Sequence, residues 1–281
     1  MISGASEKQK MDDSSSKNPG AGYFRSGLPY NRLGRGSQAL VVFGGLMFEN
    51  RPQVGLVSPY GFLRDAYSVF AVLRKPGLPV GYSLKDMADD YAGTIQEEFG
   101  GPVELIGVST GGSIAQHFAA DHPELVRRLV LHSSAHTLSE AGKRLQMKVA
   151  QLAKQGRWYA ANAAMMGFIL PHTGLMKVLS GPLNTIISAL MALNAPKDSS
   201  DLIVTVEAED SHAFRERLPE IAAPTLVIAG AEDPFYTPDL FRETAEGIPH
   251  ARLILYEGMG HAASGKRFQQ AVLSFLEEAQ P

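Results

Sequence analysis

The chain contains no cysteine among its 281 residues. That absence excludes disulfide bonds, catalysis by a thiolate, and metal or iron–sulfur sites held by cysteine. A strong excess of one charge is also missing, because 26 basic residues stand against 29 acidic ones, for a formal net charge of −3. The basic residues are scattered along the sequence, so we do not expect a nucleic-acid partner. The hydrophobic content of 44% is that of an ordinary globular protein.

Long apolar runs are missing too. The most membrane-like stretch, residues 159–170, has 12 residues and contains Asn162, which is short of the roughly 20 residues that a membrane-spanning helix needs. Residues 1–22 are polar and rich in serine, and they lack the apolar core of a secretion signal. We therefore interpret them as a disordered or tag-like lead-in, and we expect a cytoplasmic protein with no membrane span. The sequence indicates no oligomeric state.

Short apolar runs, each ended by glycine or a turn, predict the strands of a sheet. The run ALVVF at residues 39–43, followed by Gly44, is typical of a strand buried on both faces. Ser83 is a candidate N-cap for a helix whose apolar residues recur every four positions. We expect strands at residues 39–43, 67–73, 103–108, 126–132, 225–229 and 251–256, helices at 113–120 and 265–278, and a hairpin formed by 22–26 and 29–33. This alternation predicts an α/β fold with a mostly parallel, doubly wound sheet.

Residues 137–210 break the alternation. They are rich in alanine, methionine and leucine and contain no clear strand. We interpret them as a helical cap inserted between two parts of the core, residues 23–136 and 211–281, over the carboxyl edge where open α/β sheets bind ligands. Extra helices packed on the core are the alternative. A cap here predicts an apolar, adaptable substrate pocket, whose candidate lining residues are Met165, Met166, Phe168 and Met176, with Leu175 and Met191 beside them. For each of these residues, the ordinary core of a helical insertion is the alternative role.

A candidate nucleophile, Ser109, lies in the sequence GVSTG at residues 107–111, between a predicted strand and a predicted helix. A serine on so tight a turn has a strained backbone and close neighbours, and glycines two residues before and after it avoid side-chain clashes. The hydroxyl is then held above the sheet at the positive end of the following helix. A plain turn is the alternative, since the pentapeptide also arises by chance.

A serine nucleophile needs a general base, and eight histidines compete for that role. His261 differs from the others because it follows the last predicted strand, in a glycine-rich loop that can carry an imidazole over the sheet edge. Asp233 follows the preceding predicted strand and is the candidate that orients this imidazole. Glu232 is its nearest competitor, and turn formation is the alternative role for Asp233.

Stabilising the oxyanion that forms when serine attacks requires two backbone N–H groups. Thr110, directly after the candidate nucleophile, is expected to supply one of them. The second is expected from the loop that follows residues 39–43, where glycines allow a substrate to approach the backbone closely. Gly45 is the first candidate and Leu46 the second, and a plain turn is the alternative for this loop.

Taken together, these motifs resemble the α/β-hydrolase superfamily over roughly residues 23–280. The stretches STGG at 109–112, DHPE at 121–124, PTL at 224–226 and GH at 260–261 are similar to those of small esterase-like members, and the order Ser, Asp, His is that of the family. One departure is Phe43 before Gly44, where many members carry histidine. The resemblance implies the catalytic triad Ser109, Asp233 and His261, a small-molecule substrate, and neither a metal nor an organic cofactor.

We therefore expect a serine hydrolase that cleaves a carboxylic ester of a small to medium apolar substrate through an acyl-enzyme intermediate. Two alternatives stay open. The same triad could hydrolyse a lactone or a carbon–carbon bond, or the fold could serve a non-catalytic receptor that only binds a ligand. Relatives that displace halide or open epoxides use an aspartate nucleophile, so Ser109 argues against both of those reactions.

Overall fold

A computed structural model describes residues 20–170 and 176–278. Its eight-stranded sheet has the order β1-β2-β4-β3-β5-β6-β7-β8. The strands β3 to β8 pair in parallel, and β1 and β2 add an antiparallel hairpin at one edge. The strands are β1 (Gly20–Tyr23), β2 (Pro29–Leu33), β3 (Gln38–Phe43), β4 (Tyr67–Val72), β5 (Val103–Val108), β6 (Val126–His132), β7 (Thr225–Gly230) and β8 (Ala251–Tyr256). The prediction of a mostly parallel α/β sheet is confirmed.

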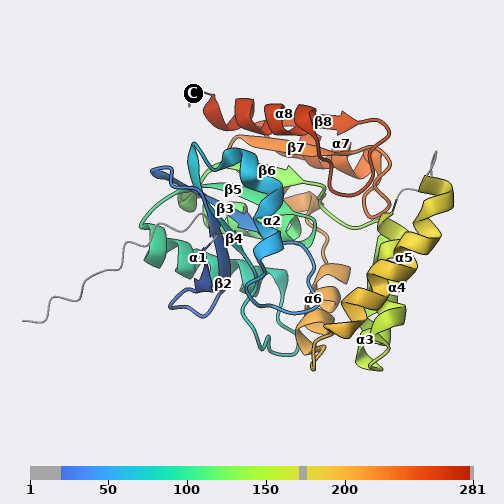
Figure 1. Cartoon of the computed structure of the whole chain (residues 1–281). Coiled ribbons are helices and arrows are strands. Elements are labelled where there is room, and N and C mark those ends of the chain that lie inside the picture. Colours follow the sequence, from blue (N-terminus) through green and yellow to red (C-terminus); the bar gives the residue numbers. More distant parts are fainter. Residues whose placement is uncertain (1–19, 171–175, 279–281) are drawn as a thin grey trace, which may run out of the picture.

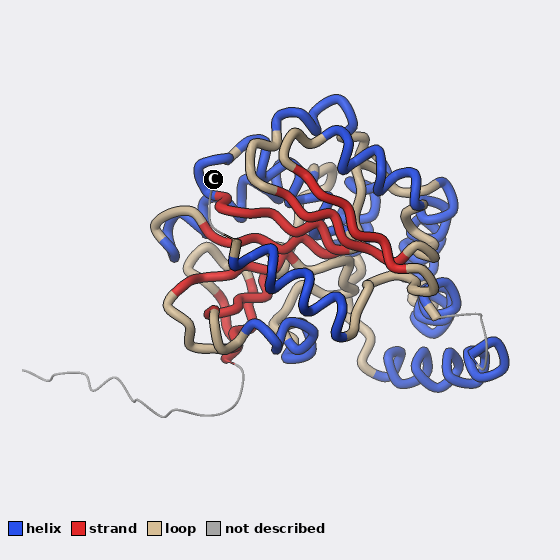
Figure 2. The backbone as a smooth tube through the Cα atoms, turned by 90° about the horizontal axis from the view of Figure 1, so that it is seen from above, coloured by secondary structure: helices blue, strands red, loops and turns tan. Residues whose placement is uncertain are grey.

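Helices cover both faces of this sheet (Figure 2). Those that alternate with the strands are α1 (Leu84–Phe99), α2 (Thr110–Asp121), α7 (Pro238–Gly247) and α8 (Lys266–Glu277). The insertion between β6 and β7 holds α3 (Glu140–Lys154), α4 (Trp158–Ile169), α5 (Met176–Leu193) and α6 (Ser200–Asp210). Short 3₁₀ turns are η1 (Val54–Leu56), η2 (Ser58–Leu63), η3 (Pro123–Leu125) and η4 (Arg215–Glu220).

The apolar runs are continuous because the central strands are buried on both faces. Successive side chains of a strand point to opposite faces, so Leu105 joins the core under α1 and α2 while Ile106 joins the core under α8. Both side chains are fully buried. Burial of this kind contributes about 1.5–3 kcal/mol for each aliphatic side chain, and it fixes β5 at the centre of the sheet.

Some predicted boundaries differ from the observed ones. The hairpin begins at Gly20, so the predicted lead-in of residues 1–22 overlaps β1, and its remaining residues lie outside the described part of the chain. The N-cap prediction is confirmed, since the Ser83 hydroxyl accepts from Asp86 N at 3.1 Å and Asp86 Oδ2 accepts from Ser83 N at 2.9 Å. Helix α7 was not predicted, because Phe241 and Thr244 are its only buried residues.

The helical insertion forms a layer of its own. Helix α3 packs on α4 and α6, and α4 packs on α5. These helices gather at the end of the molecule toward which the strands β6 and β8 point (Figure 1). In the described segments, no helix is long and apolar enough to cross a membrane.

Two histidines in ring contact, of which His212 is buried and His117 partly buried, join this layer to the core. His212 follows α6, and its ring lies 5.4 Å from that of His117 on α2 and 5.8 Å from that of Phe214. His212 is 4% exposed, and neither of its ring nitrogens has a hydrogen-bond partner among the described residues. Burial lowers the pKa of His212 to about 3 and that of His117 to about 4, so both rings are neutral in the folded protein at neutral pH.

The variant His212→Met tests this linkage. Because the pKa of His212 is lowered in the folded protein, the ring takes up a proton only when the protein unfolds. Below about pH 6.5 this proton uptake favours the unfolded state and lowers the free energy of unfolding. When the pH is lowered from 8 to 5, we expect the free energy of unfolding of wild type to fall by about 2 kcal/mol more than that of the variant. Urea unfolding at both pH values measures the difference. The exposed His250→Met is the control, and equal pH dependence of all three proteins would contradict the account.

Candidate active site

Ser109 lies on the sharp turn between β5 and α2. Its backbone has φ 51° and ψ −124°, a left-handed region that a residue with a side chain enters only under strain. Three hydrogen bonds hold it there: Ser109 N donates to His132 O at 3.0 Å, and Ser109 O accepts from Gly112 N at 2.7 Å and from Ser113 N at 3.2 Å. The residue is 9% exposed and lies at the N-terminus of α2, as the motif predicts.

The glycines of the motif are explained by close backbone contacts. A Cβ atom on Gly111 would lie 2.1 Å from the carbonyl oxygen of Phe43, and one on Gly107 would lie 2.6 Å from the Cα atom of Gly112. Because real Cβ atoms do not approach other atoms so closely, neither site accepts a side chain without movement of β3 or α2. The turn is therefore held in place by its neighbours.

Asp233 and His261 meet at the same edge of the sheet. Each follows its strand, β7 or β8, and His261 Nδ1 lies 2.8 Å from Asp233 Oδ2. The other carboxylate oxygen accepts the backbone N–H groups of Phe235 at 2.9 Å and Tyr236 at 3.3 Å, so the aspartate cannot rotate freely. Since a carboxylate only accepts, Nδ1 carries a proton, and the neutral form of this imidazole therefore has its free lone pair on Nε2. The competitor Glu232 is exposed.

The loop that carries His261 is also anchored from β6. The Ser133 hydroxyl accepts from Ala262 N at 3.1 Å, and His132 Nε2 lies 2.9 Å from the carbonyl oxygen of Ala263. Tyr60 OH lies 2.7 Å from His132 Nδ1. Because the carbonyl requires a donor, His132 carries its proton on Nε2 and accepts from the tyrosine. Burial lowers the pKa of His132 to about 4, which keeps this arrangement neutral.

The predicted oxyanion donors flank Ser109. Thr110 is the first residue of α2, where a backbone N–H has no partner within the helix. On the other side, a Cβ atom on Gly45 would lie 3.5 Å from the Cβ of Ser109, so this backbone adjoins the serine. Both Gly45 and Leu46 line the pocket described below.

A buried arginine fixes the direction of these peptide groups. Arg74 is 1% exposed, and its guanidinium donates to Gly44 O at 3.0 Å and to Gly45 O at 2.9 Å. In a trans peptide the N–H points away from the preceding carbonyl. The N–H groups of Gly45 and Leu46 are therefore turned away from Arg74.

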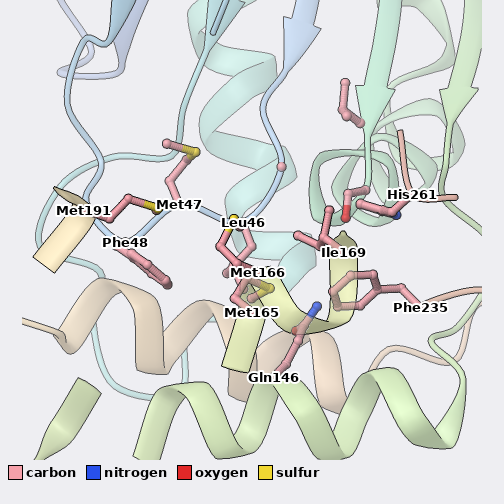
Figure 3. A pocket seen from close by; sticks show the side chains of 13 residues that line it. Leu46, Met47, Phe48, Gln146, Met165, Met166, Ile169, Met191, Phe235 and His261 are labelled. Atoms are coloured by element: carbon pink, nitrogen blue, oxygen red, sulfur yellow. The ribbon is translucent and has the colours of Figure 1, made fainter. Parts of the chain in front are cut away.

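A cavity of about 250 Å³ opens between Ser109, His261 and the helical insertion (Figure 3). Apart from Ser109, His261 and Gln146, its lining is apolar: Gly45, Leu46, Met47, Phe48, Val108, Met165, Met166, Ile169, Met191 and Phe235. Of the predicted pocket residues, Met165, Met166 and Met191 line it. Phe168 does not line it but packs on Phe235, with ring centroids 4.9 Å apart. The side chain of Met176 and all of Leu175 lie outside the described part of the chain.

Beneath the turn lies a buried carboxylate, Glu209, on the last turn of α6. It accepts hydrogen bonds from Thr110 Oγ1 at 2.6 Å, Ser113 Oγ at 3.0 Å and Tyr236 OH at 3.2 Å. Burial raises the pKa of Glu209, and these three donors together with the nearby Gln146 amide oppose that rise. Glu209 thus ties the insertion to the turn that carries Ser109.

Three residues of this region escaped the sequence analysis: Arg74, Glu209 and Gln146. Arg74 directly follows a predicted strand beside Lys75, and Glu209 lies in the acidic stretch EAED at 207–210, so both look like surface charges. Only Gln146 gives a signal in the sequence, because it is a polar residue at a position on the buried face of α3. The other buried residues of that face include Gly142, Val149 and Ala150. Among residues 20–170 and 176–278, no group of three or more histidine or acidic side chains is placed to hold a metal ion.

Comparison with known proteins agrees with this geometry. Residues 74–267 match the family model described as alpha/beta hydrolase fold. The chain belongs to the α/β-hydrolase family. Among curated relatives of this hydrolase, a 2-hydroxy-6-oxononadienedioate/2-hydroxy-6-oxononatrienedioate hydrolase from a Pseudomonas species is 24% identical over 276 residues, which cover 91% of this chain and 93% of the relative.

Solved structures show the same fold. The enol-lactonase from Burkholderia xenovorans superposes with a TM-score of 0.75 at 20% identity, covering 92% of this hydrolase and 100% of the lactonase. An esterase from Exiguobacterium antarcticum superposes with a TM-score of 0.70 at 20% identity, covering 92% and 99% of the two chains. Similarity at this level establishes the fold and leaves the substrate open.

Two glycine substitutions test how tightly the Ser109 turn is packed. Gly111→Ala forces a Cβ atom against the Phe43 carbonyl, and we expect a loss of stability of at least about 2 kcal/mol. Gly93→Ala, on the exposed face of α1 with no neighbour within 4 Å, is the matched control and should gain about 0.5–1 kcal/mol from helix propensity. Chemical denaturation measures both. A neutral Gly111→Ala would contradict the described packing.

Proposed function

We propose that this hydrolase cleaves carboxylic esters of small to medium apolar substrates, with Ser109 as nucleophile, His261 as general base and Asp233 as its orienting acid. The observation that carries the proposal is the meeting of all three at one sheet edge: Ser109 and His261 line the same cavity, and His261 Nδ1 lies 2.8 Å from Asp233 Oδ2. A base with its proton held on Nδ1 presents Nε2 as the acceptor that a serine nucleophile requires.

In the first half-reaction, Ser109 Oγ attacks the acyl carbon while His261 Nε2 takes the hydroxyl proton. The imidazolium that forms is stabilised by Asp233, and it then gives the proton to the leaving alkoxide as the carbon–oxygen bond breaks. The products are an alcohol and an acyl ester of Ser109. In the second half-reaction His261 removes a proton from water, the resulting hydroxide attacks the acyl carbon, and Ser109 recovers its proton as the acid departs.

Each attack places negative charge on the carbonyl oxygen. The backbone N–H groups of Thr110 and Gly45 would stabilise that charge, with Leu46 as the alternative second donor. Gly45 is favoured because its backbone adjoins Ser109. Arg74 acts indirectly. It holds the carbonyl oxygens of Gly44 and Gly45, so that the N–H groups of the same peptides point away from the guanidinium. Donors fixed before the reaction cost no reorganisation when the charge appears.

The cavity lining supports an apolar substrate. Its described residues are chiefly methionine, other aliphatic side chains and phenylalanine, with no lysine or arginine. The Pseudomonas relative is named for a dioate, a substrate with two carboxylates, and a buried carboxylate requires a cationic partner. This difference favours a neutral ester over such a diacid. A neutral lactone meets the same requirements and is the second candidate.

The variant Ser109→Ala tests the proposed nucleophile. We expect wild type to release p-nitrophenol from short-chain and medium-chain p-nitrophenyl esters, and Ser109→Ala to lower kcat/KM by at least about 10³-fold. The exposed Ser37→Ala is the matched control and should retain wild-type rates. Equal inactivity of wild type and Ser109→Ala on a panel of esters and lactones would contradict the proposed ester hydrolysis.

Substitution of Arg74 tests the orientation of the oxyanion donors. Arg74→Met leaves both carbonyls without their partner, and we expect kcat for the same esters to fall by about 10- to 100-fold with little change in KM. Arg74→Lys, which can reach one carbonyl, should fall between wild type and Arg74→Met. Thermal unfolding checks that all three proteins are folded. An Arg74→Met enzyme with raised KM and unchanged kcat would contradict a role of Arg74 in orienting the oxyanion donors.

A further inference from the structure

Helix α5 has its polar side chains inside and its apolar side chains outside. Its buried residues are Ser180 and Ser188, and the half-buried Asn184 donates from its amide to Ala163 O of α4 at 3.0 Å. A helix on the surface of a globular protein normally shows the reverse pattern. Of the ten large hydrophobic side chains that are exposed in the described part of the chain, seven lie on α5: Val178, Leu179, Leu183, Ile186, Leu190, Met191 and Leu193.

Most of these side chains form one apolar stripe along α5, which consists of Leu179, Leu183, Ile186, Leu190 and Leu193. The residues follow each other in alternating steps of four and three, so they lie on one face of the helix. Helix α5 packs chiefly on α4 and lies at the margin of the molecule (Figure 1), which leaves the stripe open to solvent. A contiguous exposed apolar surface of this kind marks an interaction site.

The charges around the stripe are mainly positive. Residues 140–193 contain six basic side chains and one acidic side chain, although the whole chain has a formal net charge of −3. Helices α4 and α5 are joined by a short connection and pack on each other, so they run antiparallel. The exposed Lys154 and Arg157, before α4, therefore lie near the C-terminal end of α5, which the exposed Lys197 follows. Asp198 is the acidic neighbour of this basic group.

The size and charge of this surface favour a lipid bilayer over a second copy of the chain. The 18 residues of α5 span about 27 Å and a helix is about 10 Å wide, so the face covers on the order of 300 Å². Each partner in a stable protein complex buries roughly 800 Å². A second copy would also bring a second positively charged surface against the first. A bilayer with anionic lipids attracts basic residues and accepts an apolar helix face of this size.

The stripe is continuous with the cavity that contains Ser109. Met191 is 37% exposed on α5 and also lines the cavity, where it lies beside Met47 and Phe48 (Figure 3). An apolar ester partitions from water into the acyl chains of a bilayer. Docking through α5 would therefore bring the apolar lining of the cavity to the phase in which such an ester is concentrated.

We propose that α5 docks on an anionic lipid bilayer. Its apolar stripe lies at the boundary between headgroups and acyl chains, and Lys154, Arg157 and Lys197 face the headgroups. The substrate class is then an apolar ester held in the bilayer, which enters the cavity past Met191. The docking needs no catalysis, whereas the entry of the ester rests on the proposed function.

Vesicle sedimentation tests the docking. We expect wild type to bind vesicles of phosphatidylcholine mixed with phosphatidylglycerol at least about tenfold more tightly than vesicles of phosphatidylcholine alone, and high salt to remove this difference. The double variant Ile186→Gln, Leu190→Gln should bind the mixed vesicles about tenfold more weakly than wild type. The matched control is Tyr23→Gln, Val80→Gln, at two exposed apolar positions outside the helical insertion, and it should bind like wild type.

A second pair of variants tests the charges. Lys154→Gln, Arg157→Gln should lower binding to the mixed vesicles by about tenfold and leave binding to phosphatidylcholine vesicles unchanged. The matched control is Arg25→Gln, Arg64→Gln, which removes two exposed charges outside the insertion. All the substituted side chains are exposed, so we expect unchanged Tm values, and thermal unfolding checks that every variant is folded.

The fluorescence of Trp158 locates the docked face. Trp158 is the only tryptophan and the first residue of α4, so it lies near the C-terminal end of α5. Mixed vesicles whose acyl chains carry bromine should quench the fluorescence of bound wild type. Binding without quenching would mean that another face of the molecule meets the bilayer.

The kinetic experiment compares p-nitrophenyl octanoate held in the mixed vesicles with the water-soluble p-nitrophenyl acetate. We expect Ile186→Gln, Leu190→Gln to hydrolyse the vesicle-bound ester about tenfold more slowly than wild type. It should hydrolyse the soluble ester at the wild-type rate, because neither residue lines the cavity. If wild type binds the vesicles as expected but hydrolyses neither ester, the proposed function fails and the docking stands.

Four outcomes overturn the docking. Wild type that does not bind the mixed vesicles contradicts it, as does equal binding to vesicles with and without phosphatidylglycerol. Equal binding of wild type and Ile186→Gln, Leu190→Gln contradicts the role of the stripe. A wild-type dimer in sedimentation velocity that this double variant dissociates assigns the stripe to a second copy of the chain, and the proposed ester hydrolysis is then unaffected.

Discussion

The steric fit around the turn at Ser109 governs the rest of the structure. The serine backbone has φ 51°, and Gly111 leaves no space for a side chain against the Phe43 carbonyl. Such a turn persists only where the surrounding structure determines it. Here the central position of β5 in the sheet, with apolar cores on both faces, supplies that rigidity, and the serine is held at a fixed height above the sheet edge.

Around this turn, each group of the candidate site is held by a neighbour that takes no part in the chemistry. One carboxylate oxygen of Asp233 accepts hydrogen bonds from the backbone N–H groups of Phe235 and Tyr236. Arg74 turns the Gly44 and Gly45 peptides, and Glu209 links the helical insertion to Thr110. Pre-organisation of this kind is what an enzyme needs, because groups already in position require no rearrangement in the transition state.

The fold and the candidate triad could be predicted from sequence because they depend on local patterns. Strand positions follow from apolar runs, and Ser109, Asp233 and His261 each follow a strand, so topology alone brings them to one edge. The supporting residues could not be predicted, because Arg74 and Glu209 become buried only through contacts between distant segments. The sequence could not predict which residues line the cavity either. Phe168 and Met165 are both apolar residues of α4, and tertiary packing decides which one lines the cavity.

Covalent labelling of Ser109 tests the central claim most directly. A fluorophosphonate reacts with a serine only where a base and oxyanion donors activate it. Intact mass spectrometry of the wild-type protein is expected to show one adduct, and peptide mapping should locate it on Ser109, with no adduct in Ser109→Ala. An adduct on another residue, or none after prolonged incubation with the folded protein, would contradict the account.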